Sequence, residues 1–357
     1  AMKSGAARKK IDDIELYKDQ LANRLDPSMS IMQGINAKVR KNPKRVIFAE
    51  GEDENMLKAA IEFGRNKLGI PILIGAENRV REQLKKIGLD ENYKIEIVNS
   101  TDKEKRDKYV KHLYKKLQRE GQLERDVDRL VRNDRIAWGS SMIACKDADA
   151  MVTGNIRHYA ASIEKLKKVV DARPGEEIFG MTMIVSKGKT ILVADTNVTE
   201  LPSSERLIKI SKSCVRIARL FGFEPKVAFL SHSTFGKPLS RNTRHVRDAI
   251  EKLKKEKVGF DFDGEMQPDV ALNPIYQEIY PFSKIVGNAN ILIMPALHSA
   301  AISTKLMKVF GGGKNIGPLL IGLGQPIEVA PLRASTSEIL NLASIAAYSS
   351  DVIDYSS

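Results

Sequence analysis

The chain has 357 residues, 42% of them hydrophobic, which is enough for two domains with buried cores. It has no apolar run of membrane-spanning length and no secretory signal, and its two cysteines, Cys145 and Cys214, lie far apart without metal-ligand spacing. We therefore expect a cytoplasmic protein with buried free thiols and no membrane partner.

The formal net charge of +13 makes nucleic-acid binding an alternative to weigh. The basic runs lie at residues 3–10, 103–116, 165–168 and 252–257. Because most are interleaved with acidic residues and lack aromatic neighbours, they are typical of solvated helix faces. We expect no nucleic-acid partner.

The predicted elements begin with a polar segment, residues 2–27, whose apolar residues fall near helical spacing. We interpret residues 1–29 as a linker from an absent upstream region. From residue 43, short apolar strands alternate with helices. Strands are predicted at 46–49, 72–74, 95–98 and 150–153, and helices at 53–65, 77–87, 103–119 and 136–145. This alternation indicates a mostly parallel sheet covered by helices, an α/β fold.

The second half opens differently, because residues 179–185 and 190–194 flank a short turn and predict a hairpin. Further strands are predicted at 227–230, 269–272, 291–294 and 319–321, and helices at 204–221, 242–256 and 300–310. Ser203 is placed to cap the first of these helices. After residue 322 we predict a loop, then a last helix that Ser335 can cap.

Ligands of parallel sheets lie beyond the carboxyl ends of the strands. The predicted strand ends carry small hydroxyl and amide groups, including Thr153 and Gly154 after one strand and Ser231 and Ser233 after another. Such groups suit a phosphate or a carbonyl oxygen. The acidic stretch 50–54 would repel an anion, and we expect it to cap the helix that follows.

Other site chemistries find little support in the sequence. His232 has no nucleophile elbow beside it, the remaining histidines are scattered, and the acidic segment 261–265 lacks the further ligands of a calcium loop. No glycine-rich dinucleotide or P-loop motif occurs. We therefore expect neither a metal site nor a nucleotide cofactor in this chain.

Residues 311–339 contain three successive glycines, including Gly312 and Gly313, followed by Gly317 and a proline. Glycines let backbone N–H groups approach an anion, and a capped helix start favours negative charge. By itself this pattern is weak, and loop punctuation explains it equally well.

The stretch resembles the C-terminal segment of the phosphate acetyl/butyryltransferase family, and so do residues 45–51, 147–154 and 263–271. The resemblance implies two α/β domains with mostly parallel sheets and an interdomain cleft, as in isocitrate and isopropylmalate dehydrogenases. Domain I would be discontinuous, 30–160 plus 312–357. Domain II, 161–311, would form a homodimer contact.

The chain departs from the family where its chemistry lies. Val329, Ala330, Pro331, Leu332 and Arg333 stand where the family has Asp-Leu-Ser-Arg-Gly, and Glu338 aligns with its catalytic Asp. Residues 295–301 lack an Asp and two Asn of a P-D-L-N-A-G-N segment. We therefore expect no catalytic residue here. The alternative is an active phosphate acetyltransferase that uses Glu338 and the displaced Arg333.

Residues 180–183 and 224–235 resemble the branch found in bacterial hybrid malic enzymes. In that branch a domain of this family regulates a malate-decarboxylating oxidoreductase through acetyl-CoA, within a larger homo-oligomer. The resemblance implies that NADP and a divalent metal belong to the absent upstream region only. It also implies acetyl-CoA as the ligand here, with Arg132, Lys305 and Arg333 as the candidate phosphate-binding cations.

Overall fold

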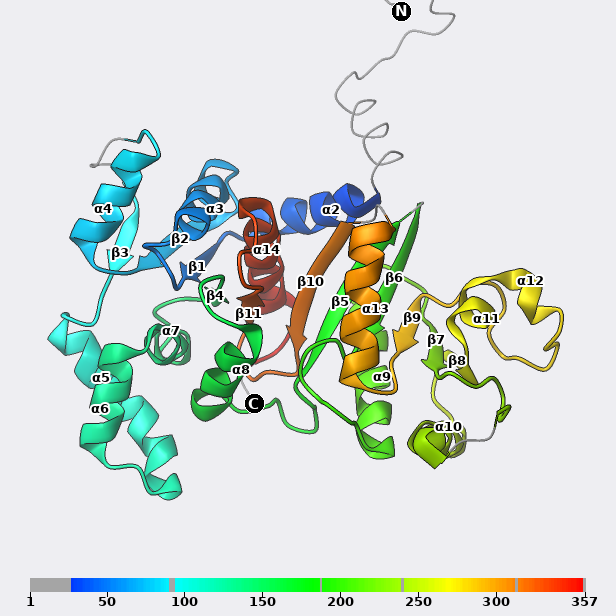
Figure 1. The fold of residues 1–357 in the computed structure, drawn as a ribbon. Helices are drawn as coiled ribbons and strands as arrows, with labels where there is room; N and C mark the ends of the chain where they lie inside the picture. The colour runs from blue at the N-terminus through cyan, green and yellow to red at the C-terminus, as the bar shows by residue number, and fades with distance from the viewer. Residues whose placement is uncertain (1–26, 90–93, 187, 239–240, 312–313, 356–357) are drawn as a thin grey trace, which may run out of the picture.

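The computed structural model describes residues 27–89, 94–186, 188–238, 241–311 and 314–355. Its strands form two sheets side by side, each covered by helices on both faces (Figure 1). The expected linker lies outside the described residues up to residue 26, and residues 27–29 begin the first described helix, α2 (Pro27–Lys41). The predicted α/β fold with two mostly parallel sheets is confirmed.

The first sheet is entirely parallel, because every neighbouring pair of its strands runs in the same direction. Its order is β11 (Ile327–Ala330), β4 (Ala150–Gly154), β1 (Lys44–Phe48), β2 (Gly69–Ile74), β3 (Glu96–Val98). The central strand β1 is a short apolar run whose alternate residues face two separate cores: Val46 and Phe48 one core, Ile47 the other.

The second sheet is mixed. Its order is β10 (Lys314–Ile321), β5 (Phe179–Ser186), β6 (Lys189–Ala194), β9 (Ile291–Ile293), β7 (Lys226–Leu230), β8 (Asp261–Met266). The predicted hairpin is confirmed as β5 and β6, with Met181 opposite Ala194. From β6 to β8 the neighbouring strands are parallel, so their carboxyl ends share one edge of the sheet.

Helices cover both faces of each sheet. Those of the first sheet are α3 (Glu54–Arg65), α4 (Glu77–Lys86), α5 (Lys103–Leu117), α6 (Glu124–Asn133), α7 (Arg135–Ala144), α8 (Tyr159–Val169) and α14 (Thr336–Val352). Those of the second are α9 (Ser204–Leu220), α10 (Arg244–Lys255), α11 (Pro268–Leu272), α12 (Pro274–Gln277) and α13 (Leu297–Phe310). Two short 3₁₀ turns, Gln118–Glu120 and Arg241–Thr243, precede α6 and α10.

Two predicted elements were wrong. Residues 269–272 were predicted as a strand but belong to α11, because Pro268 occupies the first helical turn, where its fixed φ is favourable. The strand is β8, just upstream. Residues 327–330 were predicted as loop but form β11, which pairs with β4 from Ile327 opposite Met151 to Ala330 opposite Gly154.

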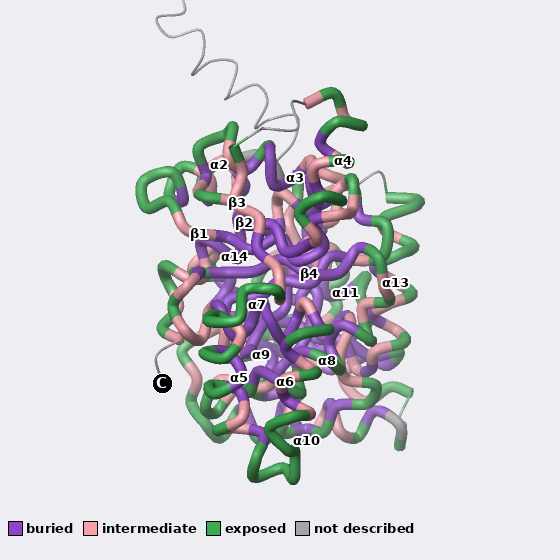
Figure 2. Tube along the Cα trace, turned by 90° about the vertical axis from the view of Figure 1, so that its left-hand side faces the viewer, coloured by how far each residue is buried: buried purple, intermediate pink, exposed green. Residues whose placement is uncertain are grey.

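The chain passes between the sheets twice. It leaves the first sheet after β4, builds β5 to β10 in the second, and returns to the first at β11. The expected domain boundary at residue 312 precedes β10, whereas β10 pairs with β5 and therefore belongs to the second sheet. Helix α14 then packs against both β4 and β10, so one apolar core reaches across both sheets. Figure 2 shows buried residues at the centre of the molecule and exposed residues around its rim.

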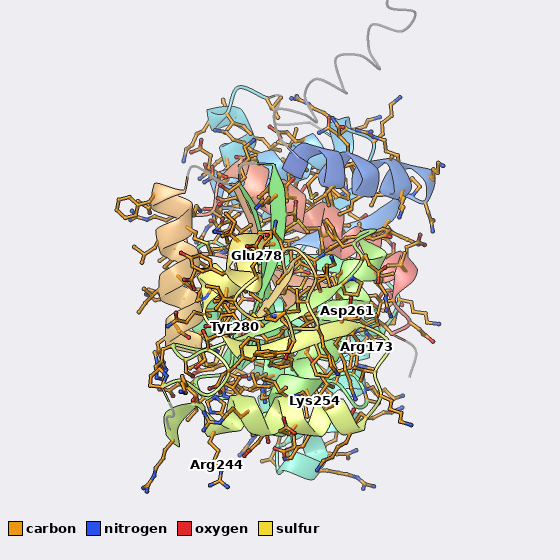
Figure 3. All side chains as sticks on the ribbon, turned by 90° about the vertical axis from the view of Figure 1, so that its right-hand side faces the viewer. Arg173, Arg244, Lys254, Asp261, Glu278 and Tyr280 are labelled. Carbon is orange, nitrogen blue, oxygen red and sulfur yellow. The ribbon has the colours of Figure 1, made fainter. Side chains whose placement is uncertain are left out.

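Charged side chains lie on the outside, and many of them are paired. On α10, Lys254 contacts Glu251 at 3.0 Å and Arg244 contacts Asp248 at 3.8 Å, and both basic side chains project outward in Figure 3. Cys214 is buried as expected, but Cys145 is half-exposed because it follows the last turn of α7; both thiols are free. Within the described residues, none of the helices has the length and apolarity to cross a bilayer.

Candidate ligand-binding site

The start of α14 lies where the two sheets meet. Ser335 is its N-cap, and the Ser335 hydroxyl accepts a hydrogen bond from the Glu338 N–H at 3.3 Å. The Glu338 carboxylate in turn accepts from the Ser335 N–H at 2.9 Å, which completes a capping box. The cap predicted at Ser335 is therefore confirmed, and it uses Glu338 as its second half.

Both carboxylate oxygens of Glu338 are engaged. Oε2 accepts from the N–H and the hydroxyl of Ser335, both at 2.9 Å, and Oε1 accepts from Lys308 Nζ of α13 at 2.9 Å. Burial acts to raise the Glu338 pKa, but the hydrogen bonds from Ser335 and Lys308 outweigh it, and the pKa is lowered. The group is thus a carboxylate with its lone pairs committed to protein donors.

A pocket of about 630 Å³ opens beside this capping box. Its walls come from α2, the end of α13, the start of β10 and the first turns of α14, so they belong to both sheets. The lining residues are Met32, Gln33, Asn36, Lys308, Lys314, Asn315, Ile316, Ser335, Ser337, Glu338 and Asn341. We call this the junction pocket. Its lysine and amide groups suit an anionic, heteroatom-rich ligand, and sequence reasoning found only Ser335 and Glu338 among them.

Thr153 and Gly154 end β4 beside a buried carboxyl group. The Thr153 hydroxyl and the Gly154 N–H each donate to Glu50 at 3.0 Å, and burial raises the pKa of Glu50 to about 7. A Cβ on Gly154 would lie 2.4 Å from the Ala330 carbonyl oxygen, so this position requires glycine. The expected helix cap in segment 50–54 is Asp53, which accepts from the Met56 N–H.

Ser231 and Ser233 follow β7 on the second sheet. The Ser233 hydroxyl donates to Glu265 at 2.7 Å and lies 3.0 Å from the Ser231 hydroxyl. Arg247 also contacts Glu265, at 3.2 Å. Ser233 is thus part of a buried structural network, whereas Ser231 also lines a pocket on the second sheet.

The three candidate cations do not converge. Arg132 lies on α6, pairs with Asp128 at 2.7 Å and lines a separate pocket at the ends of β2 and β3. Lys305 is on the exposed face of α13. Arg333 follows β11 with φ of +59° and donates its N–H to the Asn155 carbonyl at 2.9 Å. Spacing along a sequence does not reveal such separations.

Only part of the glycine-containing segment 311–317 lies within the described residues. Gly312 and Gly313 lie outside the described residues. Gly317 has φ of +112° at an irregularity in the pairing of β10 with β5, and a Cβ there would lie 2.7 Å from the Leu319 nitrogen. Backbone geometry therefore accounts for Gly317 without a ligand.

Several buried polar atoms between the sheets were missed by sequence reasoning. Within the described residues, Asn155 Oδ1, Arg157 Nη1 and the Tyr159 hydroxyl have no hydrogen-bond partner. Arg157 Nη2 lies 3.9 Å from Glu50. Arg157 could have been found from the sequence, because this cation lies three residues after the end of the buried strand β4. Among the described residues, no cluster of three or more histidine, cysteine or acidic side chains could hold a metal ion.

A family model described as phosphate acetyl/butaryl transferase matches residues 30–347. The chain belongs to the phosphate acetyl/butyryl transferase family. The resemblance recognised in the sequence is thereby confirmed.

The similar curated proteins fall into two groups. The chain is 43% identical over 349 residues to the NADP-dependent malic enzyme of Rhizobium meliloti, covering 98% of this chain and 46% of that protein. It is 29% identical over 326 residues to a phosphate acetyltransferase of Clostridium acetobutylicum, covering 89% of this chain and 97% of that protein. The chain spans about half the length of the malic enzymes it matches.

Solved structures agree with the fold. A phosphotransacetylase from Streptococcus pyogenes matches with a TM-score of 0.84 and 27% identity, over 90% of this chain and 98% of its own. EutD phosphotransacetylase from Staphylococcus aureus matches with a TM-score of 0.80 and 26% identity, over the same shares. The two-sheet architecture is therefore that of phosphotransacetylases.

Proposed function

We propose that this chain binds acetyl-CoA in the junction pocket as a regulatory ligand and transfers no acetyl group. The observation that carries the proposal is Glu338, whose two carboxylate oxygens are held by Ser335 and Lys308 beside an open pocket. Such a site keeps a place for the ligand while the aligned catalytic position serves as a helix cap.

The chemistry expected of the family needs a base for the thiol of coenzyme A and donors for the developing oxyanion. A general base works best with a pKa near the working pH, and the Glu338 pKa is lowered instead. Pro331 and Leu332 offer no side-chain donor to an oxyanion. Loss of one such donor typically costs about 100- to 1000-fold in rate, so losing several leaves little transfer.

The larger context follows from the malic enzymes that the chain matches. We infer that the chain is the phosphate acetyltransferase-like domain of a malic enzyme that oxidatively decarboxylates malate to pyruvate. NADP and a divalent metal would bind in the other half of such a protein. For acetyl-CoA to regulate that activity, it must bind two states of the whole protein with different affinity.

We also propose a homodimer through the second sheet. Helix α13 lies in front of that sheet in Figure 1, and of its described residues only Ala300 and Thr304 are buried. Its outer face carries large apolar side chains, with Val309 74% and Phe310 83% exposed. The exposed set is Ile302, Leu306, Val309 and Phe310. An apolar stripe at helical spacing is typical of a contact surface.

The binding proposal can be tested by thermal unfolding with acetyl-CoA. At 100-fold saturation a ligand of the folded state adds about 2.7 kcal/mol, which is a melting shift of a few degrees for a chain of this size. Ser337 is exposed at the rim of the junction pocket, so Ser337→Trp should block the shift. Ser337→Ala keeps the pocket open and should preserve the shift, as should Arg132→Ala in the separate pocket.

A coupled thiol assay with acetyl phosphate and coenzyme A tests the absence of transfer. We expect no rate above background for the parent chain or for Glu338→Gln. Turnover at ordinary enzyme rates, roughly 1 to 1000 per second, would establish an active phosphate acetyltransferase instead. An unchanged melting point with saturating acetyl-CoA would refute the sensing role for this chain.

A further inference from the structure

A second pocket of about 630 Å³ opens at the carboxyl ends of β7 and β9, in the second sheet. Its lining residues are Leu201, Leu230, Ser231, His232, Thr243, His245, Pro268, Met294, Pro295, Ala296, His298, Ser299 and Ser303. Among the described residues, it shares no lining residue with the junction pocket. The two pockets adjoin opposite ends of α13, roughly 14 Å apart from Ser299 to Lys308 at 1.5 Å per residue.

The position of this pocket is one at which α/β sheets bind ligands. Strands β7 and β9 are parallel neighbours, but their connections run to opposite faces of the sheet. Helix α10, which follows β7, packs with Phe229 in one core, and Ala300 of α13, which follows β9, packs with Leu292 in another. Adjacent connections that diverge in this way leave a crevice at the strand ends, which is where open sheets hold their ligands.

Three of the five histidines in the chain line this crevice. His232 follows β7, His245 lies in the first turn of α10, and His298 lies in the first turn of α13. The His245 Nε2 atom is 3.0 Å from the Pro295 carbonyl oxygen, a contact that joins the two sides of the pocket. An imidazole supplies at least one N–H donor in either protonation state. The Nε2–H of His245 donates to the Pro295 carbonyl, so His232 and His298 supply the ring donors that remain for a ligand.

The helix starts add to this preference for an anion. Both α10 and α13 begin at the pocket, and the positive end of a helix dipole favours negative charge. The N-cap of α13 is Ala296, whose methyl group cannot accept a hydrogen bond from the first turn. Acidic side chains are absent from the lining as far as the described residues show. The pocket thus combines donors with a lack of negative charge.

The rest of the lining narrows the class of anion. Lysine and arginine, which usually hold phosphate groups, are also absent from the described lining. Leu201, Leu230 and Met294 provide an apolar wall instead. We propose that this histidine pocket binds a short-chain carboxylate, with its carboxyl group among the imidazoles and its hydrocarbon tail against that wall.

Nuclear magnetic resonance of the histidine rings tests the proposal with internal controls. On titration with butyrate at constant ionic strength, ring signals of His232, His245 and His298 should move together and saturate. Signals of His112 and His158, which lie outside the pocket, should not move. Signals that do not saturate, or that move equally for all five rings, would overturn the proposal.

Variants and a second anion sharpen the test. His298 and His112 are both exposed, so His298→Ala and His112→Ala should both fold, which their melting points would verify. The first should weaken butyrate binding about tenfold, the worth of one hydrogen bond to a charged group, and the second should leave it unchanged. Equal weakening by both would overturn the proposal, as would inorganic phosphate binding as tightly as butyrate.

Butyrate binding in the histidine pocket can be tested separately from acetyl-CoA binding in the junction pocket. Ser337→Trp blocks the junction pocket and should leave butyrate binding unchanged. If it abolished butyrate binding, the carboxylate would occupy the junction pocket and the assignment to the histidine pocket would be wrong. A missing acetyl-CoA response together with intact butyrate binding would refute the proposed function alone.

Discussion

Glu328 is a carboxyl group buried where the two sheets meet. It lies on β11 of the first sheet and accepts a hydrogen bond at 2.8 Å from the Leu320 N–H on β10 of the second. Burial raises its pKa to about 8, because an ionised carboxylate is costly to hold away from water. The folded protein therefore keeps this group protonated at neutral pH.

This raised pKa makes part of the folding stability depend on pH. The unfolded chain releases the proton near pH 4.5, whereas the folded chain holds it up to about pH 8. The stabilising contribution is therefore full below the unfolded pKa and is lost as pH rises to the folded pKa. Glu328→Gln keeps an oxygen for the Leu320 N–H and cannot ionise. We expect it to raise the unfolding free energy by roughly 1 to 4 kcal/mol at pH 8.5 and far less at pH 4.5.

Urea unfolding at both pH values measures this difference. Glu104→Gln, on the exposed side of α5, is the matched control and should change stability little at either pH. Destabilisation of the Glu328→Gln variant by the same amount at both pH values would show that the residue acts through packing, and that its protonation is irrelevant.

At the scale of elements, α13 exposes four large apolar side chains and buries only Ala300 and Thr304 among its described residues. Leu306 lies near the middle of its exposed stripe and is 51% exposed. If the proposed dimer covers this face, Leu306→Glu should produce a monomer, because it places two charges in a shared apolar contact. Light scattering at micromolar concentration gives the mass directly.

The control for this substitution lies on the other sheet. Ile70 of β2 is 54% exposed, so Ile70→Glu makes the same kind of change away from α13 and should leave the mass unaltered. A parent chain that is already monomeric would refute the proposed dimer. A Leu306→Glu variant that remains a dimer would place the dimer contact on another surface.

Sequence reasoning found elements whose residues carry their own signal. The apolar runs of β1, β4, β5 and β6 are evident because their side chains are buried along most of β4 and β5 and in the last three residues of β1 and β6. It missed β8, which contains Asp261, Asp263 and Glu265. Asp263 and Glu265 are buried, and they are stabilised by partners far along the chain: the Lys284 N–H donates to Asp263 and Arg247 pairs with Glu265. Sequence reasoning missed β11 for the same reason, since Glu328 interrupts its apolar pattern.

The candidate site was predicted less well than the fold. Ser335 and Glu338 are three positions apart at one helix start, so their proximity could be predicted from the sequence. Lys308 reaches Glu338 across 30 residues, which no local spacing reveals. Arg132 was grouped with Arg333 because both are basic. Only the fold shows that Arg132 lies on α6 beside the ends of β2 and β3, whereas Arg333 follows β11.

At the scale of the whole molecule, the shared core predicts that both sheets unfold together. Helix α14 contributes Leu342 and Ile345 to a core that also contains Phe48 of the first sheet and Phe229 of the second. The chain has one tryptophan, Trp138, buried in the other core of the first sheet. Its fluorescence and the far-ultraviolet circular dichroism, which reports both sheets, should give coincident urea transitions. A second transition seen only by circular dichroism would show that the second sheet unfolds independently.

The interrupted order of the first sheet has a consequence for the chain as the ribosome makes it. When β4 has been synthesised, its outer edge still lacks β11, and the apolar face that α14 covers is open. The missing pieces emerge only after the whole second sheet, more than 170 residues later, which takes roughly 10 to 35 s at 5 to 20 residues per second. During that interval the nascent chain presents an unpaired strand edge and an uncovered apolar surface. Its N-terminal half is protected from aggregation only by chaperones, or by the later pairing of β11 and packing of α14.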